Sequence, residues 1–150
     1  MKLSDFIAKG QVKKVSKDNA LARSLILTAE NDLKFLENLE INNISARKII
    51  SLYYDVLRSV LEAISILDGY KIYSHEAFTY YLKEKKEELM ANKFDRFRKI
   101  RNNINYYGKD ISVEEAKENS AEIIRLIKLI KIIYAKKEAV WNYKTLCFSY

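Results

Sequence analysis

The sequence has no proline, three glycines, one cysteine and one histidine among its 150 residues. Because tight turns depend on glycine and proline, this scarcity excludes sandwiches and barrels made of many short strands. A single cysteine cannot form an intrachain disulfide, and together with one histidine it cannot supply the ligands of a zinc site. The composition therefore favours long helices, and we predict no metal site.

Long apolar runs are also missing. The N-terminal MKLSDFIAKGQVKK lacks the apolar core of a signal peptide, and the most apolar segment is interrupted by Arg125, Lys128 and Lys131. We therefore expect a cytoplasmic protein that does not enter the membrane. Positive charge is in excess, since 27 Lys and Arg against 20 Asp and Glu give a net charge of +7. Such a surface favours a polyanion such as nucleic acid, and it equally serves solubility.

Apolar residues recur at three-and-four spacing in five segments, which is the pattern of amphipathic helices. The predicted helices cover residues 16–39, 45–68, 75–91, 92–107 and 112–137. The residues expected at their boundaries are Ser16 or Asp18, Ser74 and Ser112 as N-caps, and Gly69 and Gly108 at C-terminal ends. Since the connections are only about three to six residues long, sequential helices should pack against each other. We therefore predict an all-α, five-helix antiparallel up-down bundle that forms a single domain over residues 1–150.

The second predicted helix has a wide apolar face, which includes Ile50, Tyr54, Leu57 and Leu61. We therefore expect it at the centre of the bundle. In the third predicted helix, the side chains expected to point into the core are those of Phe78, Tyr81, Leu82 and Leu89.

Two end segments fall outside this bundle. Residues 1–15 lack apolar periodicity, and we expect a mobile arm or a short separate helix there. Residues 138–150 form an aromatic tail, which either continues the last helix or packs in an extended form. Burial of each large apolar side chain stabilises by about 1.5–3 kcal/mol, so we expect this tail to dock on the bundle or on a second subunit.

One segment, residues 94–109, combines basic, amide and aromatic side chains at the end of the fourth predicted helix. Phe97, Arg101 and Asn105 lie one above another at helical spacing, which places Arg101 at the edge of the core. A guanidinium there suits bidentate binding of a phosphate, and tyrosine rings offer stacking faces for bases. The same residues also fit a helix end whose arginines complement the helix dipole. The candidate phosphate ligands are Arg96, Arg98 and Arg101.

Other catalytic patterns are missing. The glycines are scattered, so the chain has no glycine-rich loop for phosphates or dinucleotides, and we predict no cofactor. The lone His75 is accompanied by no nucleophile motif, which argues against a hydrolase triad.

The pair Arg101-Asn102, followed by Ile104-Asn105-Tyr106-Tyr107-Gly108 on the fourth helix, resembles the HEPN superfamily of small helical proteins from prokaryotes. Supporting features are Tyr53-Tyr54, the Leu-Glu-Ala-Ile at 61–64 and the Tyr-Ser-His-Glu at 73–76. The resemblance covers residues 16–137. It implies a five-helix bundle that forms a homodimer, and in many members a separately encoded minimal nucleotidyltransferase as partner.

In the ribonuclease members of that superfamily, an arginine grips the scissile phosphate, and a histidine that follows after four to six intervening residues is the acid–base group. This sequence is similar to a branch with an amide or acidic residue followed by tyrosine, here Asn105 and Tyr106. A phenol with a pKa near 10 is a poor general base at neutral pH compared with an imidazole near 6.5. His75 can take the acid–base role of the missing motif histidine only if the start of the third predicted helix lies beside Tyr106.

Three functional hypotheses follow. The first is a homodimer in a toxin–antitoxin or nucleotidyltransferase-associated system that binds RNA or a nucleotide phosphate. Its binding residues would be Arg98, Arg101, Asn102, Asn105 and Tyr106. The second is a metal-independent endoribonuclease toxin, whose catalytic candidates are Arg101, Tyr106 and His75. The third is a structural partner subunit of a minimal nucleotidyltransferase.

Overall fold

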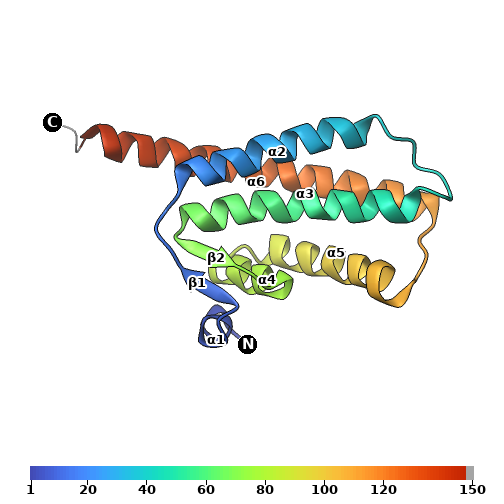
Figure 1. Ribbon diagram of the computed structural model, residues 1–150, viewed down its shortest axis with the longest axis horizontal. Coiled ribbons are helices and arrows are strands. Elements are labelled where there is room, and N and C mark those ends of the chain that lie inside the picture. The colour runs from blue at the N-terminus through green and yellow to red at the C-terminus, as the bar shows by residue number, and fades with distance from the viewer. Residues whose placement is uncertain (148–150) are drawn as a thin grey trace.

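The computed structural model, which describes residues 1–147 and the side chains of residues 1–139, is mostly helical and is arranged around one central helix. Its elements in chain order are α1 (Leu3–Ala8), β1 (Val12–Lys14), α2 (Asn19–Glu37), α3 (Ala46–Leu67), β2 (Tyr70–Ile72), α4 (His75–Glu84), α5 (Glu88–Tyr107) and α6 (Val113–Cys147). The central helix is α3, and α2, α6 and the pair of α4 and α5 pack around it (Figure 1). The central position predicted for the second helix is therefore confirmed.

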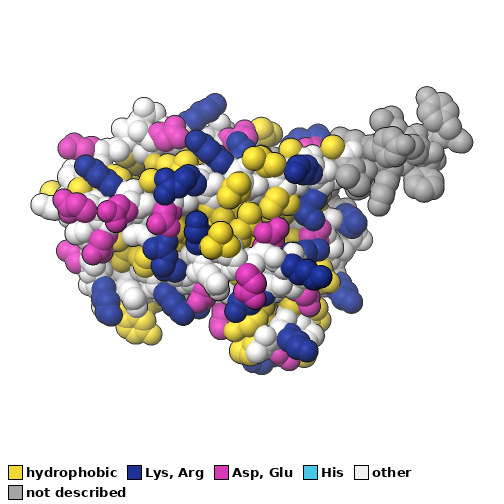
Figure 2. Space-filling view, turned by 180° about the vertical axis from the view of Figure 1, so that it is seen from behind, with side chains coloured by type: hydrophobic (Ala, Val, Ile, Leu, Met, Phe, Trp, Pro, Cys, Tyr) yellow, Lys and Arg dark blue, Asp and Glu magenta, His cyan; other side chains and the backbone are white. Residues whose placement is uncertain are grey.

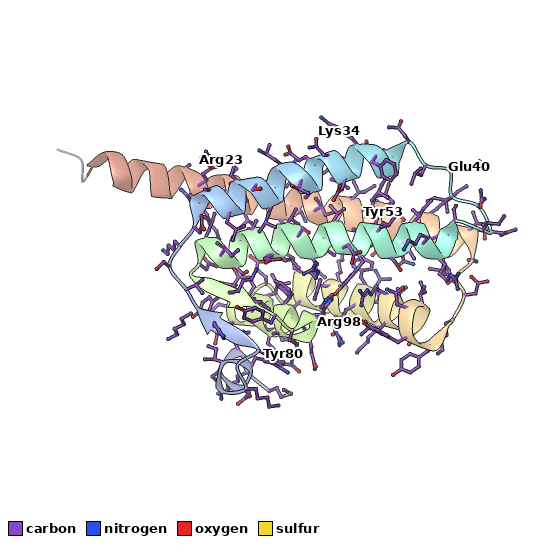
Figure 3. All side chains as sticks on the ribbon, in the orientation of Figure 1. Arg23, Lys34, Glu40, Tyr53, Tyr80 and Arg98 are labelled. Atoms are coloured by element: carbon purple, nitrogen blue, oxygen red, sulfur yellow. The ribbon has the colours of Figure 1, made fainter. Side chains whose placement is uncertain are left out.

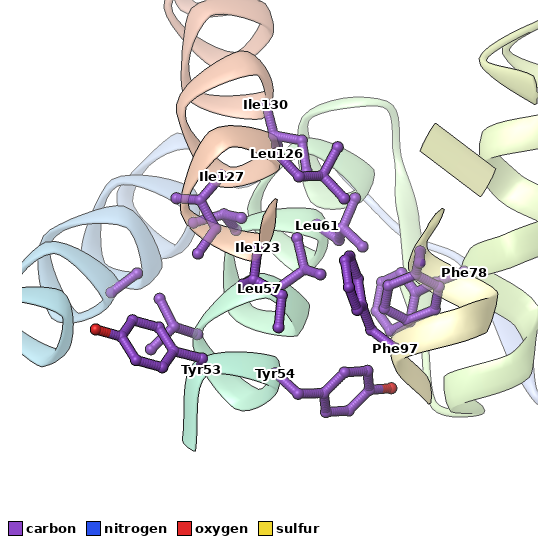
Figure 4. Packing of buried hydrophobic residues seen from close by; sticks show 14 of the residues in the cluster. Tyr53, Tyr54, Leu57, Leu61, Phe78, Phe97, Ile123, Leu126, Ile127 and Ile130 are labelled. Atoms are coloured by element: carbon purple, nitrogen blue, oxygen red, sulfur yellow. The ribbon is translucent and has the colours of Figure 1, made fainter. Parts of the chain in front are cut away.

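The core lies on both sides of α3. Leu57 and Leu61 face the apolar side of α6, whose contributions are Ile123, Leu126, Ile127 and Ile130 (Figure 4). The consecutive residues Tyr53 and Tyr54 point to opposite sides, Tyr53 toward α2 and Tyr54 toward α4 and α5. Each fully buried side chain of this kind stabilises the fold by about 1.5–3 kcal/mol. Within residues 1–147, no helix has an apolar stretch long enough to cross a bilayer.

Three predicted capping residues bound their helices, whereas Ser74 stands at the start of α4 without a side-chain capping hydrogen bond. The Asp18 carboxylate accepts the Leu21 N–H at 2.9 Å and begins α2. The Ser112 hydroxyl accepts the Glu115 N–H at 3.1 Å and begins α6. Gly108 ends α5 with φ of 63°, in the left-handed region that glycine adopts without strain.

The prediction of one helix over residues 75–91 is wrong, because α4 ends at Glu84. The chain turns through a left-handed Lys86 at φ 62°, and the Glu87 N–H donates to the Leu82 carbonyl at 3.0 Å. This is the Schellman arrangement, with lysine in the position that glycine commonly occupies. The turn resets the helical phase, so Leu89 is 70% exposed rather than inward.

The arm at residues 1–15 is docked rather than mobile. Leu3 and Phe6 of α1 are at most 2% exposed, and the ring centroid of Phe6 lies 5.1 Å from that of Tyr80. β1 pairs antiparallel with β2, with Val12 opposite Ile72. Three well-spaced apolar residues therefore hold the arm, although they are too few to make a periodic pattern.

The last helix does not end near Lys137 but continues to Cys147, so of the two forms considered for residues 138–150 the helical one is correct as far as Cys147. Glu138 belongs to this helix and accepts a hydrogen bond from Arg23 of α2 at 2.8 Å. The predicted docking of the aromatic side chains of the tail lies outside the described residues.

The carboxylate of Asp68, at the end of α3, is contacted by side chains from three parts of the chain. Lys137 of α6 donates to it at 2.6 Å, Lys85 lies 3.1 Å away, and the hydroxyl of Tyr81 donates to it as well. Burial by itself would raise the pKa of Asp68, but the hydrogen bonds from Lys137, Tyr81 and Lys85 outweigh it and hold that pKa below its ordinary value.

Replacement of this carboxylate should destabilise the fold. We expect Asp68→Asn to lower the free energy of unfolding at pH 7 by about 1–3 kcal/mol, because its donors lose a charged acceptor. Since the folded pKa lies below the unfolded one, this stabilisation is present above about pH 4 and is lost as the pH falls below that value. Urea unfolding at pH 7 and pH 3 measures both effects. The control Asp32→Asn, on the exposed side of α2, should change stability by less than about 0.5 kcal/mol; equal effects of the two substitutions contradict the prediction.

Candidate functional site

The residues that the sequence singles out lie where α3, the start of α4 and the second half of α5 meet. α3 and α5 run in opposite directions (Figure 1), and Arg98 of α5 lies at the seam between them (Figure 3). On the opposite face of the molecule, basic and acidic side chains are interspersed around an apolar strip (Figure 2).

Arg101 is held between two tyrosine rings. The central carbon of its guanidinium lies 5.7 Å from the ring centroid of Tyr54 and 5.5 Å from that of Tyr106. Nη1 donates to the Tyr106 hydroxyl at 3.2 Å and reaches the Asn102 Oδ1 at 3.5 Å. The stacking fixes the guanidinium plane through cation–π attraction.

Arg101 is incompletely paired within the chain. Its Nε is buried and meets no acceptor among the described residues. In the same part of the chain no carboxylate forms an ion pair with it, whereas Arg58 and Arg98 each have one nearby. A buried N–H without an acceptor is costly, so this group is suited to an oxyanion supplied from outside.

His75 is joined to this arginine through Tyr54. Its Nδ1 lies 2.9 Å from the Tyr54 hydroxyl, and the two rings stack with centroids 5.8 Å apart. Burial raises the pKa of Tyr54 well above its ordinary value, so the hydroxyl stays protonated at neutral pH. The phenol therefore orients the imidazole through its hydroxyl and supports the guanidinium of Arg101 through its ring.

The imidazole of His75 is uncharged at neutral pH. Its pKa is lowered to about 4, chiefly because burial disfavours the charged ring. The rest of the shift comes from three positive charges, those of Arg58, Arg101 and Arg98. A single neutral base is therefore surrounded by cations.

Two further arginines flank the site. Arg98 donates from Nε and Nη2 to one oxygen of Asp95, at 3.0 and 2.7 Å. Burial alone would raise the pKa of Asp95, but hydrogen bonds from Lys99 and Arg98 hold it below its ordinary value. Arg58 of α3 lies 3.8 Å from Glu62, and its Nε is buried without an acceptor among the described residues. Arg58 is thus a second guanidinium with unused donors.

The structure separates some of the predicted site residues. Asn105 lies one turn beyond Arg101, where its Oδ1 accepts the Ser51 hydroxyl at 3.1 Å. Arg96 does not belong to the site, because it donates to Glu122 of α6. Positions five residues apart differ by about 140° around an α-helix, so Arg96 and Arg101 point in different directions. Among the described residues, no group of three His, Cys, Asp or Glu side chains is placed to hold a metal ion.

Sequence reasoning missed the roles of Tyr54 and Arg58. Both lie on α3, four residues apart, so they share one helix face. That spacing was visible in the sequence. What the sequence did not show is that this face of α3 lies against Arg101, because the pairing of α3 with α5 is a tertiary contact.

The pKa of His75 can be measured directly by NMR. It is the only histidine in the chain, so its ring-proton NMR signal is unambiguous. We expect a titration midpoint near pH 4, compared with about 6.5 in the urea-unfolded chain.

Because the folded pKa lies below the unfolded one, the free energy of unfolding should fall as the pH drops from about 6.5 toward the folded value. A His75→Gln variant should lose that part of the pH dependence. A midpoint at or above 6.5 in the folded protein would show that the imidazole does not lie among these cations.

Comparison with known proteins adds no family to this geometry. No family model matches the sequence, and no curated protein matches it. Function is therefore inferred from the side chains of the site, from their charges and from the motif resemblance of the fourth predicted helix.

Proposed function

We propose that this protein is a HEPN-like helical protein that binds a phosphate group of RNA or of a nucleotide through Arg101. The observation that carries the proposal is the guanidinium of Arg101, stacked between two tyrosines and left without a carboxylate partner among the described residues. A guanidinium oriented in this way is suited to a bidentate, charge-assisted bond with a phosphate. Arg58 and Arg98 add positive charge beside it.

Exposed aromatic rings favour a ligand that carries bases. Tyr106 is 69% exposed and Tyr107 is 74% exposed, and both follow Arg101 on the same helix. One face of Tyr106 is covered by Arg101. The uncovered ring surfaces offer stacking platforms for nucleobases, and the amide of Asn102 lies beside them.

The order of helices supports the proposed resemblance to the HEPN superfamily. Each of the five bundle helices predicted from the sequence has a counterpart among α2 to α6. On this proposal the protein acts as a homodimer within a toxin–antitoxin or nucleotidyltransferase-associated system. Light scattering tests the dimer, and co-purification with a minimal nucleotidyltransferase tests that partner. The role of a purely structural partner subunit stays a prediction.

A metal-independent endoribonuclease is the second candidate function. It is favoured by the hydrogen bond that joins His75 to Tyr54, because this bond places an imidazole next to the proposed phosphate site. With Nδ1–H donating to the Tyr54 oxygen, the free Nε2 of the neutral imidazole can accept the proton of a ribose 2′-hydroxyl. The 2′-oxygen then bonds to phosphorus, the bond to the 5′-oxygen breaks, and the leaving 5′-oxygen takes up the proton that His75 received. A bound phosphate also offsets the arginine charges, which raises the pKa of His75 toward the operating pH.

Removal of the guanidinium tests the binding function. We expect Arg101→Gln to weaken binding of a fluorescent single-stranded RNA by about tenfold to a hundredfold, because a charge-assisted contact is lost. Fluorescence anisotropy at fixed salt measures the affinity. The control Arg125→Gln removes the same charge from an exposed position on α6 and should change affinity by less than about twofold, as expected for a charge remote from the site. Equal binding by Arg101→Gln and the unchanged protein would falsify the proposal.

Incubation with RNA in EDTA tests the catalytic function. If His75 is the base, the protein should yield fragments with 2′,3′-cyclic phosphate ends, and His75→Gln should abolish cleavage while it preserves RNA binding. Tyr106→Phe should reduce cleavage less, because its hydroxyl contacts the arginine rather than the base. Intact RNA at high protein concentration counts against the enzyme and leaves the binding function standing.

A further inference from the structure

A polar pocket lies further along the seam between α3 and α5. It has a volume of about 260 Å³, and it opens between the first turn of α3 and the last turns of α5. Its lining residues are Arg47, Lys48, Ser51, Ile104 and Asn105. Two of these side chains are cationic and none is acidic, so the pocket attracts anions.

The polar groups of this pocket are arranged as donors. Ser51 is buried, and its hydroxyl donates to the Oδ1 of Asn105 at 3.1 Å. Because the amide oxygen of Asn105 is used in this way, its two N–H groups remain for a ligand. Neither Arg47 nor Lys48 forms an ion pair within the described part of the chain, and both side chains are exposed. The pocket thus combines a guanidinium, an ammonium and an amide.

The pocket lies about one helical turn from the site around Arg101. Asn105 follows Arg101 by one turn of α5, a rise of about 6 Å. On α3, Ser51 precedes Tyr54 by about one turn, so the contact between Ser51 and Asn105 lies beside the contact between Tyr54 and Arg101. Two groups of side chains that can donate hydrogen bonds to a phosphate therefore follow one another along the seam between α3 and α5.

We propose that the pocket formed by Arg47 and Lys48 is a second phosphate subsite, which holds a neighbouring phosphate of the same strand that Arg101 holds. The ligand is then a single-stranded polynucleotide rather than a mononucleotide. Adjacent phosphates of a nucleoside triphosphate share one bridging oxygen, so they lie closer together than the one-turn rise of about 6 Å that separates Arg101 from Asn105. A single strand carries one phosphate per nucleotide and leaves its bases free to stack on exposed tyrosines. This inference rests on the proposed binding function of Arg101.

The test compares two ligands and two variants. The ligands are uridine 5′-monophosphate and a fluorescent octauridylate whose 2′-O-methyl groups prevent cleavage. The shift of the His75 ring proton reports the mononucleotide at the Arg101 site, and anisotropy reports the octanucleotide. We expect the double variant Arg47→Gln, Lys48→Gln to weaken octanucleotide binding about tenfold to a hundredfold. The dependence of its log affinity on log salt should become shallower by about 0.7, the value for one phosphate contact of a single strand.

The double variant should retain the mononucleotide-induced shift of His75, whereas Arg101→Gln should lose both responses. The control Lys117→Gln, Lys128→Gln removes two exposed charges from α6 and should bind the octanucleotide as the unchanged protein does. Circular dichroism confirms that each variant is folded.

Each remaining outcome is decisive. If the Arg47 and Lys48 variant binds the octanucleotide normally while Arg101→Gln does not, the subsite is wrong and the proposed function stands. Equal loss of both ligands in the double variant also overturns the subsite, because the two groups of donors then act on one phosphate. If neither variant weakens octanucleotide binding, the proposed function itself fails.

Discussion

The burial of α3 is the constraint on which the rest of the structure depends. A helix that is apolar around most of its circumference must be covered on every side, since apolar surface left in water costs about 25 cal/mol per Å². The helices α2, α6 and the α4–α5 pair provide that cover. The polar side chains of α3 are consequently confined to the edges where its neighbours meet. Ser51 and Arg58 fall on the edge that α3 shares with the candidate site, so the packing of the core also builds the polar seam.

Within this seam Arg58 and Arg98 each face a carboxylate of their own helix, but Arg101 faces none within residues 1–139. At other helix contacts a cation faces a carboxylate, as Lys131 faces Glu30 at 2.7 Å. Arg101 instead rests on aromatic rings, and the nearby imidazole stays uncharged chiefly because it is buried, with three arginines further opposing its protonation. Like charges gathered at a partly buried place destabilise a fold unless an anion balances them. A phosphate, like a carboxylate, can bind both prongs of a guanidinium.

Much of the helical framework could be predicted from local signals, because caps and periodicity act within one or two turns. Asp18, Gly108 and Ser112 bound their helices as expected. The break at Lys86 had no such signal, since lysine rarely adopts positive φ and a run of charged residues is compatible with a continuous helix. The docking of residues 1–15 could not be predicted from the sequence for a different reason. The pairing of β1 with β2 joins residues about sixty positions apart, and a three-residue strand carries no periodic pattern of its own.

The sequence by itself determined which residue types lie near one another on a single helix. Arg101, Asn102 and Tyr106 are brought together by the helical repeat, and they do contact one another. Only the tertiary structure decided that Tyr54 supports Arg101 from α3 and that His75 joins them from the start of α4. The physical reason is that side-chain direction within a helix is set by local geometry. Contacts between helices depend instead on how α3 is buried, which no local segment specifies.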